Sequence, residues 1–144
     1  MDAKTFDKLG AELNHARARF QEMQSHFERF CAEAERFNEP QSLVKGVTVE
    51  REDQMLFVEY LDRRIRISMR FDHKAAKGAL HVEDLSATER PMKTIPRIPF
   101  DDSGQTDLGR GEEPGKLTLA EARDCKRLAL HCIELALDQD PWAS

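Results

Sequence analysis

Two histidines in the middle of the chain are the side chains best suited to binding a metal ion. His73 follows Asp72, and His81 lies two residues before Glu83. If the chain between them folds back, two imidazoles and two carboxylates could bind a divalent cation. No diagnostic spacing such as H-E-x-x-H or C-x-x-C accompanies them, so we predict no metal site. The other histidines are expected at solvated positions of helices: His15, His26 and His131.

Three cysteines could supply a nucleophile or a disulfide. A nucleophilic thiol needs a base and an electropositive setting, and the sequence shows neither beside Cys31, Cys125 or Cys132. Cys125 and Cys132 lie about 10 Å apart along a predicted helix, beyond disulfide reach. We expect buried, reduced thiols, which are typical of the cytoplasm.

Two segments rich in Asp, Glu and Gly have the composition of ligand-binding loops but not the residue order. Residues 101–107 lack the Asp-x-Asp-x-Asn-Gly order of a calcium loop. The glycines of 109–115 fit neither nucleotide fingerprint, and Glu112 and Glu113 would repel a phosphate. With no catalytic residue, metal or cofactor indicated, we predict that the protein is not an enzyme.

An arginine-rich strand is the most distinctive chemical feature. Arg64, Arg66 and Arg70 alternate with apolar residues, which places them on one face of a strand. Phe57 is expected on the same face of the neighbouring strand, beside Leu61. Arginine and aromatic side chains are enriched where proteins dock. We predict that another protein binds here, through Phe57, Leu61, Arg64, Arg66 and Arg70.

Two alternatives involve other ligands. Residues 63–77 carry six basic side chains and one acidic one, so strand 64–70 could follow a nucleic-acid backbone. The acidic segment 101–113 would then fold over it as a competitor. In the second alternative a small molecule binds in a pocket between the helices and the sheet, which no sequence pattern would reveal.

The first forty residues predict one long helix. Its apolar residues are spaced alternately three and four apart, which is the heptad pattern of a single apolar stripe. Pro40 ends the pattern, so we expect a helix over 3–37, about 50 Å long. The stripe consists of Phe6, Leu9, Leu13, Ala16, Phe20, Met23, Phe27, Phe30, Ala34 and Phe37.

Residues 43–100 predict a four- or five-stranded antiparallel meander. Alternating apolar residues indicate strands near 47–50, 55–61, 64–71 and 79–85, and 94–100 could add an edge strand containing Pro96 and Pro99. With turns at 51–54 and 62–63, Val58 is expected to face Val47 and Ile67. One face of this sheet is apolar and the other mostly polar.

The last third predicts a loop and a second helix. Residues 101–116 are expected to form an acidic mobile loop. Thr118 and Glu121 have the spacing of a capping box, and a helix over 119–138 should follow. Its small residues suit the phenylalanine ridge of the first helix. The whole chain, 1–144, is thus one α+β domain with both helices on one face of the sheet.

The predicted first helix is longer than the sheet behind it. Four strands form a sheet about 19 Å wide, with strands about 23 Å long. Part of the apolar stripe needs other cover, so we predict a two-fold homodimer. A parallel zipper is disfavoured because Arg19 would meet Gln24. An antiparallel pair, or packing of the stripe on a sheet, suits bulky rings better. The expected interface is Phe6, Leu9, Leu13, Phe20, Met23 and Phe27.

Composition and charge describe a globular protein of one ordinary domain. The 144 residues are 40% hydrophobic and 34% charged. The net charge of −5 comes mainly from 101–113, because 1–100 holds 17 basic and 17 acidic residues. Such a balanced body disfavours bulk attraction to nucleic acid or anionic lipid. The sequence also lacks the apolar runs that predict a membrane span or a signal peptide.

We therefore expect a small cytoplasmic, bacterial, homodimeric adaptor or chaperone-like protein that acts through its surfaces. Its size, acidity and order of elements are similar to those of secretion chaperones, which cradle an extended client. No motif carries this similarity, and the 35-residue opening helix departs from it, so no family is assigned.

Overall fold

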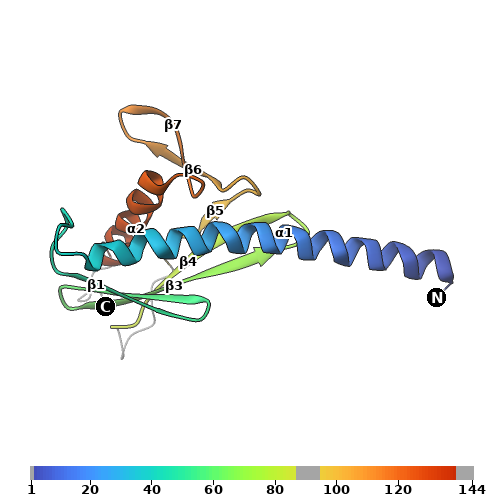
Figure 1. The fold of residues 1–144 in the computed structure, drawn as a ribbon, viewed down its shortest axis with the longest axis horizontal. Coiled ribbons are helices and arrows are strands. Elements are labelled where there is room, and N and C mark those ends of the chain that lie inside the picture. The colour runs from blue at the N-terminus through green and yellow to red at the C-terminus, as the bar shows by residue number, and fades with distance from the viewer. Residues whose placement is uncertain (1, 87–94, 139–144) are drawn as a thin grey trace.

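The computed structural model describes residues 2–86 and 95–138. A long helix is followed by a seven-stranded antiparallel sheet and a second helix (Figure 1), which confirms the predicted α+β class. Every strand pairs with the next one in the sequence, so the sheet is a simple meander. The elements are α1 (Ala3–Glu35), the short 3-10 helix η1 (Arg36–Asn38), β1 (Val47–Glu52), β2 (Met55–Tyr60), β3 (Arg63–Asp72), β4 (Lys77–Asp84), β5 (Ile98–Phe100), β6 (Gln105–Arg110), β7 (Glu113–Thr118) and α2 (Ala122–Leu137).

Helix α1 is unbroken, as predicted. The side chain of Asp2 caps its first turn by accepting a hydrogen bond from the backbone N–H of Thr5 at 2.8 Å. At the other end η1 tightens the last turn before Pro40. The heptad pattern and its stop signal therefore identified this element to within a few residues.

The first two hairpins have the predicted faces but a register shifted by two residues. Val58 pairs with Val49 and Ile65, rather than with Val47 and Ile67. Both turns consist of two residues, and the first residue of each has a positive φ. Because side chains alternate with a period of two, a shift of two keeps each one on its predicted face.

The sheet has seven strands, not four or five, because the segment predicted as an acidic mobile loop forms the hairpin β6–β7. Gly111, with φ of 72°, lies in its turn, where glycine avoids the strain of a side chain. Thr106 and Arg110 point inward and bond to Leu117 and to Asp124 of α2, respectively. Because Thr106 and Arg110 are polar residues that face inward, β6 lacks the alternation of apolar and polar residues that usually predicts a strand.

Strand β5 is not at an edge, as its prolines had suggested, but lies between β4 and β6. It is only three residues long, and a single residue pair, Phe100 with Thr106, joins it to β6. A strand this short tolerates Pro99, which has no N–H to donate. The predicted start of this strand, Thr94, is outside the described residues.

Helix α2 begins three residues later than predicted, at Ala122, and the capping box does not form. Glu121 occupies the N-cap position without a side-chain hydrogen bond. The Thr118 hydroxyl instead accepts from the N–H of Ala120, and the N–H of Thr118 donates to the Asp124 carboxylate. This local turn competes with the predicted cap and delays the helix.

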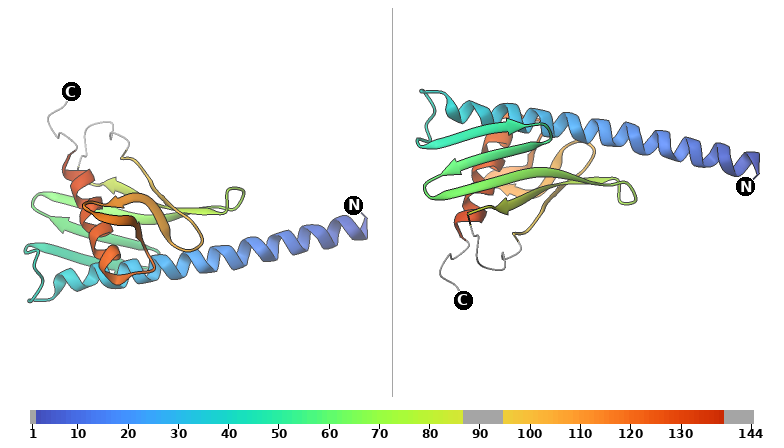
Figure 2. Two further views of the ribbon diagram at one scale, coloured as in Figure 1. Left: turned by 90° about the horizontal axis from the view of Figure 1, so that it is seen from above. Right: turned by 90° about the horizontal axis from the view of Figure 1, so that it is seen from below.

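Both helices lie on the same side of the sheet (Figure 2). Helix α1 runs along the β1 edge, and α2 crosses the sheet and packs against α1. One core holds the inner face of the sheet, Phe27 and Phe30 of α1, and the small side chains of α2: Cys125, Ala129, Cys132 and Ala136. Phe27 and Phe30 stack within it, with ring centroids 6.0 Å apart.

Candidate interaction surfaces

The N-terminal half of α1 extends beyond the sheet (Figures 1 and 2). We call residues 3–20 the arm. Its large apolar side chains are exposed: Phe6 is 68% accessible, Leu9 42%, Leu13 62% and Phe20 39%. These are four of the six residues predicted to form a dimer interface, and the other described residues leave Phe6, Leu9 and Leu13 exposed and cover Phe20 only in part.

The other two predicted interface residues, Met23 and Phe27, are fully buried in the chain's own core. They are therefore unavailable to a second copy, and the expected interface is corrected to the arm alone. The reason is the length of the β3–β4 hairpin, whose far end reaches α1. There Phe71 packs edge-on against Phe20, with ring centroids 5.6 Å apart.

Glycine at position 78 makes this close approach possible. A Cβ there would lie 2.6 Å from Cζ of Phe100 and 2.9 Å from Sδ of Met23. Polar anchors begin one turn further along α1. The imidazole of His26 is hydrogen-bonded to the carbonyl of Asp102, and Arg29 donates to the carbonyl of Ala120. The sheet and the loops at Asp102 and Ala120 thus hold α1 from Met23 onward.

The face of the sheet away from the helices carries the predicted recognition residues. The guanidinium of Arg64 lies over the ring of Phe57, 5.1 Å from its centroid, in a cation–π contact that leaves Phe57 only 9% exposed. Arg70 is exposed, and Leu61, at the β2–β3 turn, is 76% exposed. The structure therefore brings Phe57 and Arg64 together and leaves Leu61 and Arg70 open to solvent.

Arg66 is engaged within the chain. Its guanidinium donates two hydrogen bonds to the carboxylate of Glu83, at 3.2 and 2.7 Å. These bonds, above all, lower the pKa of Glu83 below its ordinary value. This ion pair engages one of the three arginines that a nucleic-acid backbone would need along this strand. The acidic segment does not cover the arginines either, because β6–β7 packs against α2 on the other side of the sheet.

Sequence reasoning missed another exposed leucine. Leu43, in the connection from α1 to β1, is 99% exposed. Because Val47 pairs with Tyr60, this connection and the β2–β3 turn with Leu61 lie at the same end of the sheet. That end is opposite to the β3–β4 hairpin, which meets the arm.

Two ion pairs that contain a buried carboxylate were also missed. Arg63 donates to Asp84 at 2.5 Å on the inner face of the sheet, with both side chains more than nine-tenths buried. Asp124, fully buried in α2, accepts hydrogen bonds from Arg110 and from the N–H of Thr118. The first pair was hidden by the predicted turn at 62–63, and the second by the predicted loop. Both hold elements together rather than face solvent.

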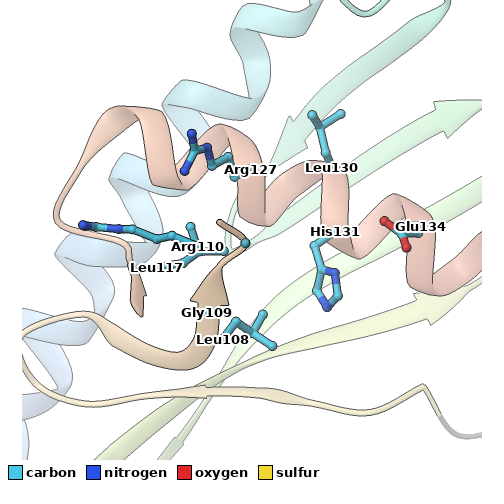
Figure 3. A pocket seen from close by; sticks show the side chains of 9 residues that line it. Leu108, Gly109, Arg110, Leu117, Arg127, Leu130, His131 and Glu134 are labelled. Carbon is cyan, nitrogen blue, oxygen red and sulfur yellow. The ribbon is translucent and has the colours of Figure 1, made fainter. Parts of the chain in front are cut away.

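A shallow cavity of about 310 Å³ lies between the β6–β7 hairpin and α2 (Figure 3). Leu108, Leu117 and Leu130 line it, and His131 and Glu134 lie on one side of α2 beside it. Both of its arginines form ion pairs within the chain, Arg110 with Asp124 and Arg127 with Glu113. The cavity is where a small-molecule ligand was envisaged, but its cations are already paired.

Of the four side chains considered for a metal site, His81 and Glu83 lie side by side, with Nε2 and Oε1 3.6 Å apart, but the two histidines do not come together. His73 lies in the β3–β4 turn and His81 on β4, four residues, or about 13 Å, beyond Lys77 where the strand begins. Among the described residues, no group of three or more His, Cys, Asp or Glu side chains could hold a metal ion. Burial raises the pKa of each thiol, Cys31, Cys125 and Cys132, to about 12, so the reactive thiolate is scarce at neutral pH.

Comparison of the chain with protein-family models, curated proteins and solved structures finds no match. In the described part of the chain, neither helix is long and apolar enough to cross a lipid bilayer.

Proposed function

We propose that this protein is a non-enzymatic, homodimeric adaptor or chaperone-like protein of the cytoplasm. Two copies join through the arm, and the outer face of the sheet binds another protein. The observation that carries this proposal is the exposed apolar stripe of the arm.

The stripe is a preformed surface. Asp2 caps the helix and α1 continues without a break into the core, so the arm is ordered as an extension of a buried helix. Its phenylalanines and leucines recur on one side over most of the arm's length of about 27 Å. Contiguous apolar surface of this kind marks a site of association.

A second copy of the chain suits the arm in charge. Residues 2–22 contain four acidic side chains and four basic ones, so two arms carry no net repulsion. The acidic residues are Asp2, Asp7, Glu12 and Glu22, and the basic residues are Lys4, Lys8, Arg17 and Arg19.

The recognition face for another protein is formed by Arg64 stacked on Phe57, together with Leu61 and Arg70. Leu43 adds a second apolar side chain at the same end of the sheet as Leu61. Because Leu43 and Leu61 lie at the end of the sheet away from the arm, a dimer joined by its arms keeps this end free on both copies, whereas Arg70 lies toward the end that meets the arm. Two sites on one particle raise the avidity for a multivalent partner.

The experiment is to replace Leu9 and Leu13 together by Gln and to measure the particle mass by sedimentation velocity at micromolar concentration. We expect a dimer for the unmodified chain and a monomer with unchanged helical circular dichroism for the variant. Leu43→Gln, an equally polar change at an exposed leucine outside the arm, is the control and should remain dimeric. Equal masses for the arm variant and the unmodified chain would contradict the proposal.

A further inference from the structure

The arm limits how a second copy can pair with it, because its apolar stripe ends where the sheet begins. With Phe6 at heptad position a, Leu13 and Phe20 are also a residues, and Leu9, Ala16 and Met23 are d residues. Glu12 and Arg19 are both g residues beside the stripe. Both side chains are exposed, and within the described residues neither forms an ion pair.

Of the antiparallel alignments that place a residues opposite d residues along this stripe, the one with Phe6 opposite Leu9 overlaps too little, and the one with Phe6 opposite Phe37 sets the arm against buried residues, which leaves three. They put Phe6 of one copy opposite Ala16, Met23 or Phe30 of the other. In an antiparallel pair the g residues of the two helices face each other, so each alignment makes a different pairing of charges.

Charge favours the middle alignment. With Phe6 opposite Ala16, Glu12 faces Glu12 of the second copy. With Phe6 opposite Phe30, Arg19 faces Arg19. Only with Phe6 opposite Met23 does Glu12 face Arg19, and the two-fold axis makes this contact twice.

Burial favours the same alignment. Placing Phe6 opposite Phe30 requires the second arm to occupy the position of the sheet, because Phe27 and Phe30 are fully buried within the chain. Placing Phe6 opposite Ala16 leaves Phe20 without an apolar neighbour from the second copy. The middle alignment sets Leu9 opposite Phe20 and Leu13 opposite Ala16, each twice.

The position at which the arm ends also agrees with the middle alignment. In the middle alignment Phe6 of the second copy reaches the level of Met23, where Phe71 packs on Phe20 and the β3–β4 hairpin closes the stripe. The second arm thus covers the exposed stripe up to the sheet. Because Met23 is buried within its own chain, the apolar contacts between the two copies run over residues 9–20, about 17 Å of helix.

From these constraints we infer that two copies pair through antiparallel arms, with Leu9 against Phe20, Leu13 against Ala16, and Glu12 of each copy bound to Arg19 of the other. This inference rests on the proposed dimer and specifies its geometry. It predicts that the charges at 12 and 19 decide which arms can pair.

The test is a charge exchange at these two positions in the full chain, read by sedimentation equilibrium. In a dimer of the Glu12→Arg variant, the new arginine of each copy faces Arg19 of the other. In a dimer of the Arg19→Glu variant, the new glutamate of each copy faces Glu12 of the other. Each variant alone should therefore dimerise about 10- to 30-fold more weakly than the unmodified chain. Mixing the two variants restores two attractive contacts, so they should form a heterodimer with nearly the original affinity. The double variant E12R/R19E should likewise recover the homodimer.

Matched controls reverse charge at c positions on the other side of the arm, Lys8→Glu and Glu22→Arg, and should leave the dimer unchanged. A parallel pair places position 12 opposite Arg17, so E12R/R19E would stay weakened and the mixture would not recover. Unaltered dimers for both single variants would overturn the antiparallel alignment and leave the dimer itself standing. An unmodified chain that is monomeric at every concentration would instead overturn the proposed function.

Discussion

The carboxamide of Asn38 binds both backbone polar groups of Val49. Its Nδ2 donates to the carbonyl of Val49 at 2.7 Å, and its Oδ1 accepts from the N–H of Val49 at 2.8 Å. Val49 lies on β1, the edge strand of the sheet, so the side chain imitates a neighbouring strand at that point. An edge strand with free backbone groups is a template for unwanted pairing, and Asn38 occupies part of this template.

Replacing Asn38 by Ala should destabilise the protein by about 1–3 kcal/mol, because two partly buried backbone groups lose their partners. Urea unfolding measures this directly. Asn14→Ala, the same change on the exposed arm, is the control and should have little effect. If the two variants were equally stable, the carboxamide of Asn38 would not be holding the edge strand.

Two glycines should respond to alanine with opposite signs. At Gly78 a Cβ would lie within 3 Å of Phe100 and Met23, so Gly78→Ala should destabilise by about 1–3 kcal/mol through overpacking. At Gly10, in the arm, a Cβ meets nothing within 4 Å. Gly10→Ala should therefore stabilise the helix by up to about 1 kcal/mol. Thermal melts of both variants check the pair, and a loss of stability in G10A would contradict the open surroundings of the arm.

The ion pair between Arg66 and Glu83 should make stability depend on acidity in a defined direction. The pKa of Glu83 is held below its ordinary value of 4.5 by hydrogen bonds from Arg66. The carboxylate thus contributes stability above pH 4.5, and this contribution is lost as the pH falls through the lowered value. At pH 7 we expect Glu83→Gln to be less stable by about 1 kcal/mol or less, since the pair is partly exposed. The difference should vanish in strong acid, and a difference that persists unchanged into strong acid would exclude this origin.

The periodic parts of the fold were predictable from the sequence, and the polar parts were not. The stripe from Phe6 to Phe37 defined α1 because a helix half buried and half exposed still repeats every seven residues. That repeat does not show where along α1 the sheet begins to cover the apolar stripe. This position depends on the β3–β4 hairpin reaching Phe20 and burying Met23.

The errors in the sheet have a common physical cause. A register shift of two residues leaves the apolar pattern unchanged, so alternation alone could not place Arg63 opposite Tyr60 and inside the sheet. Likewise, β6 turns Thr106 and Arg110 inward, and their partners, Leu117 and Asp124, are reached only through the tertiary fold. Local sequence therefore gave no signal for the hairpin.

Polynucleotide binding separates the proposed adaptor from a nucleic-acid-binding protein. With Arg66 paired to Glu83 and Arg64 stacked on Phe57, we expect no tight complex with single- or double-stranded DNA or RNA at low salt. Fluorescence anisotropy between about 50 and 200 mM salt tests this, because phosphate contacts weaken steeply over that range. A tight, strongly salt-dependent complex that is lost in Arg64→Glu/Arg70→Glu would favour the arginine strand as a nucleic-acid track.

The molar mass of the unmodified chain in solution tests association through the arm most directly. One chain is 16.5 kDa, and its arm leaves an apolar stripe exposed. Light scattering on a sizing column at tens of micromolar should return twice the mass of one chain, falling toward a single chain on dilution. A mass of one chain at every concentration would contradict association through the arm.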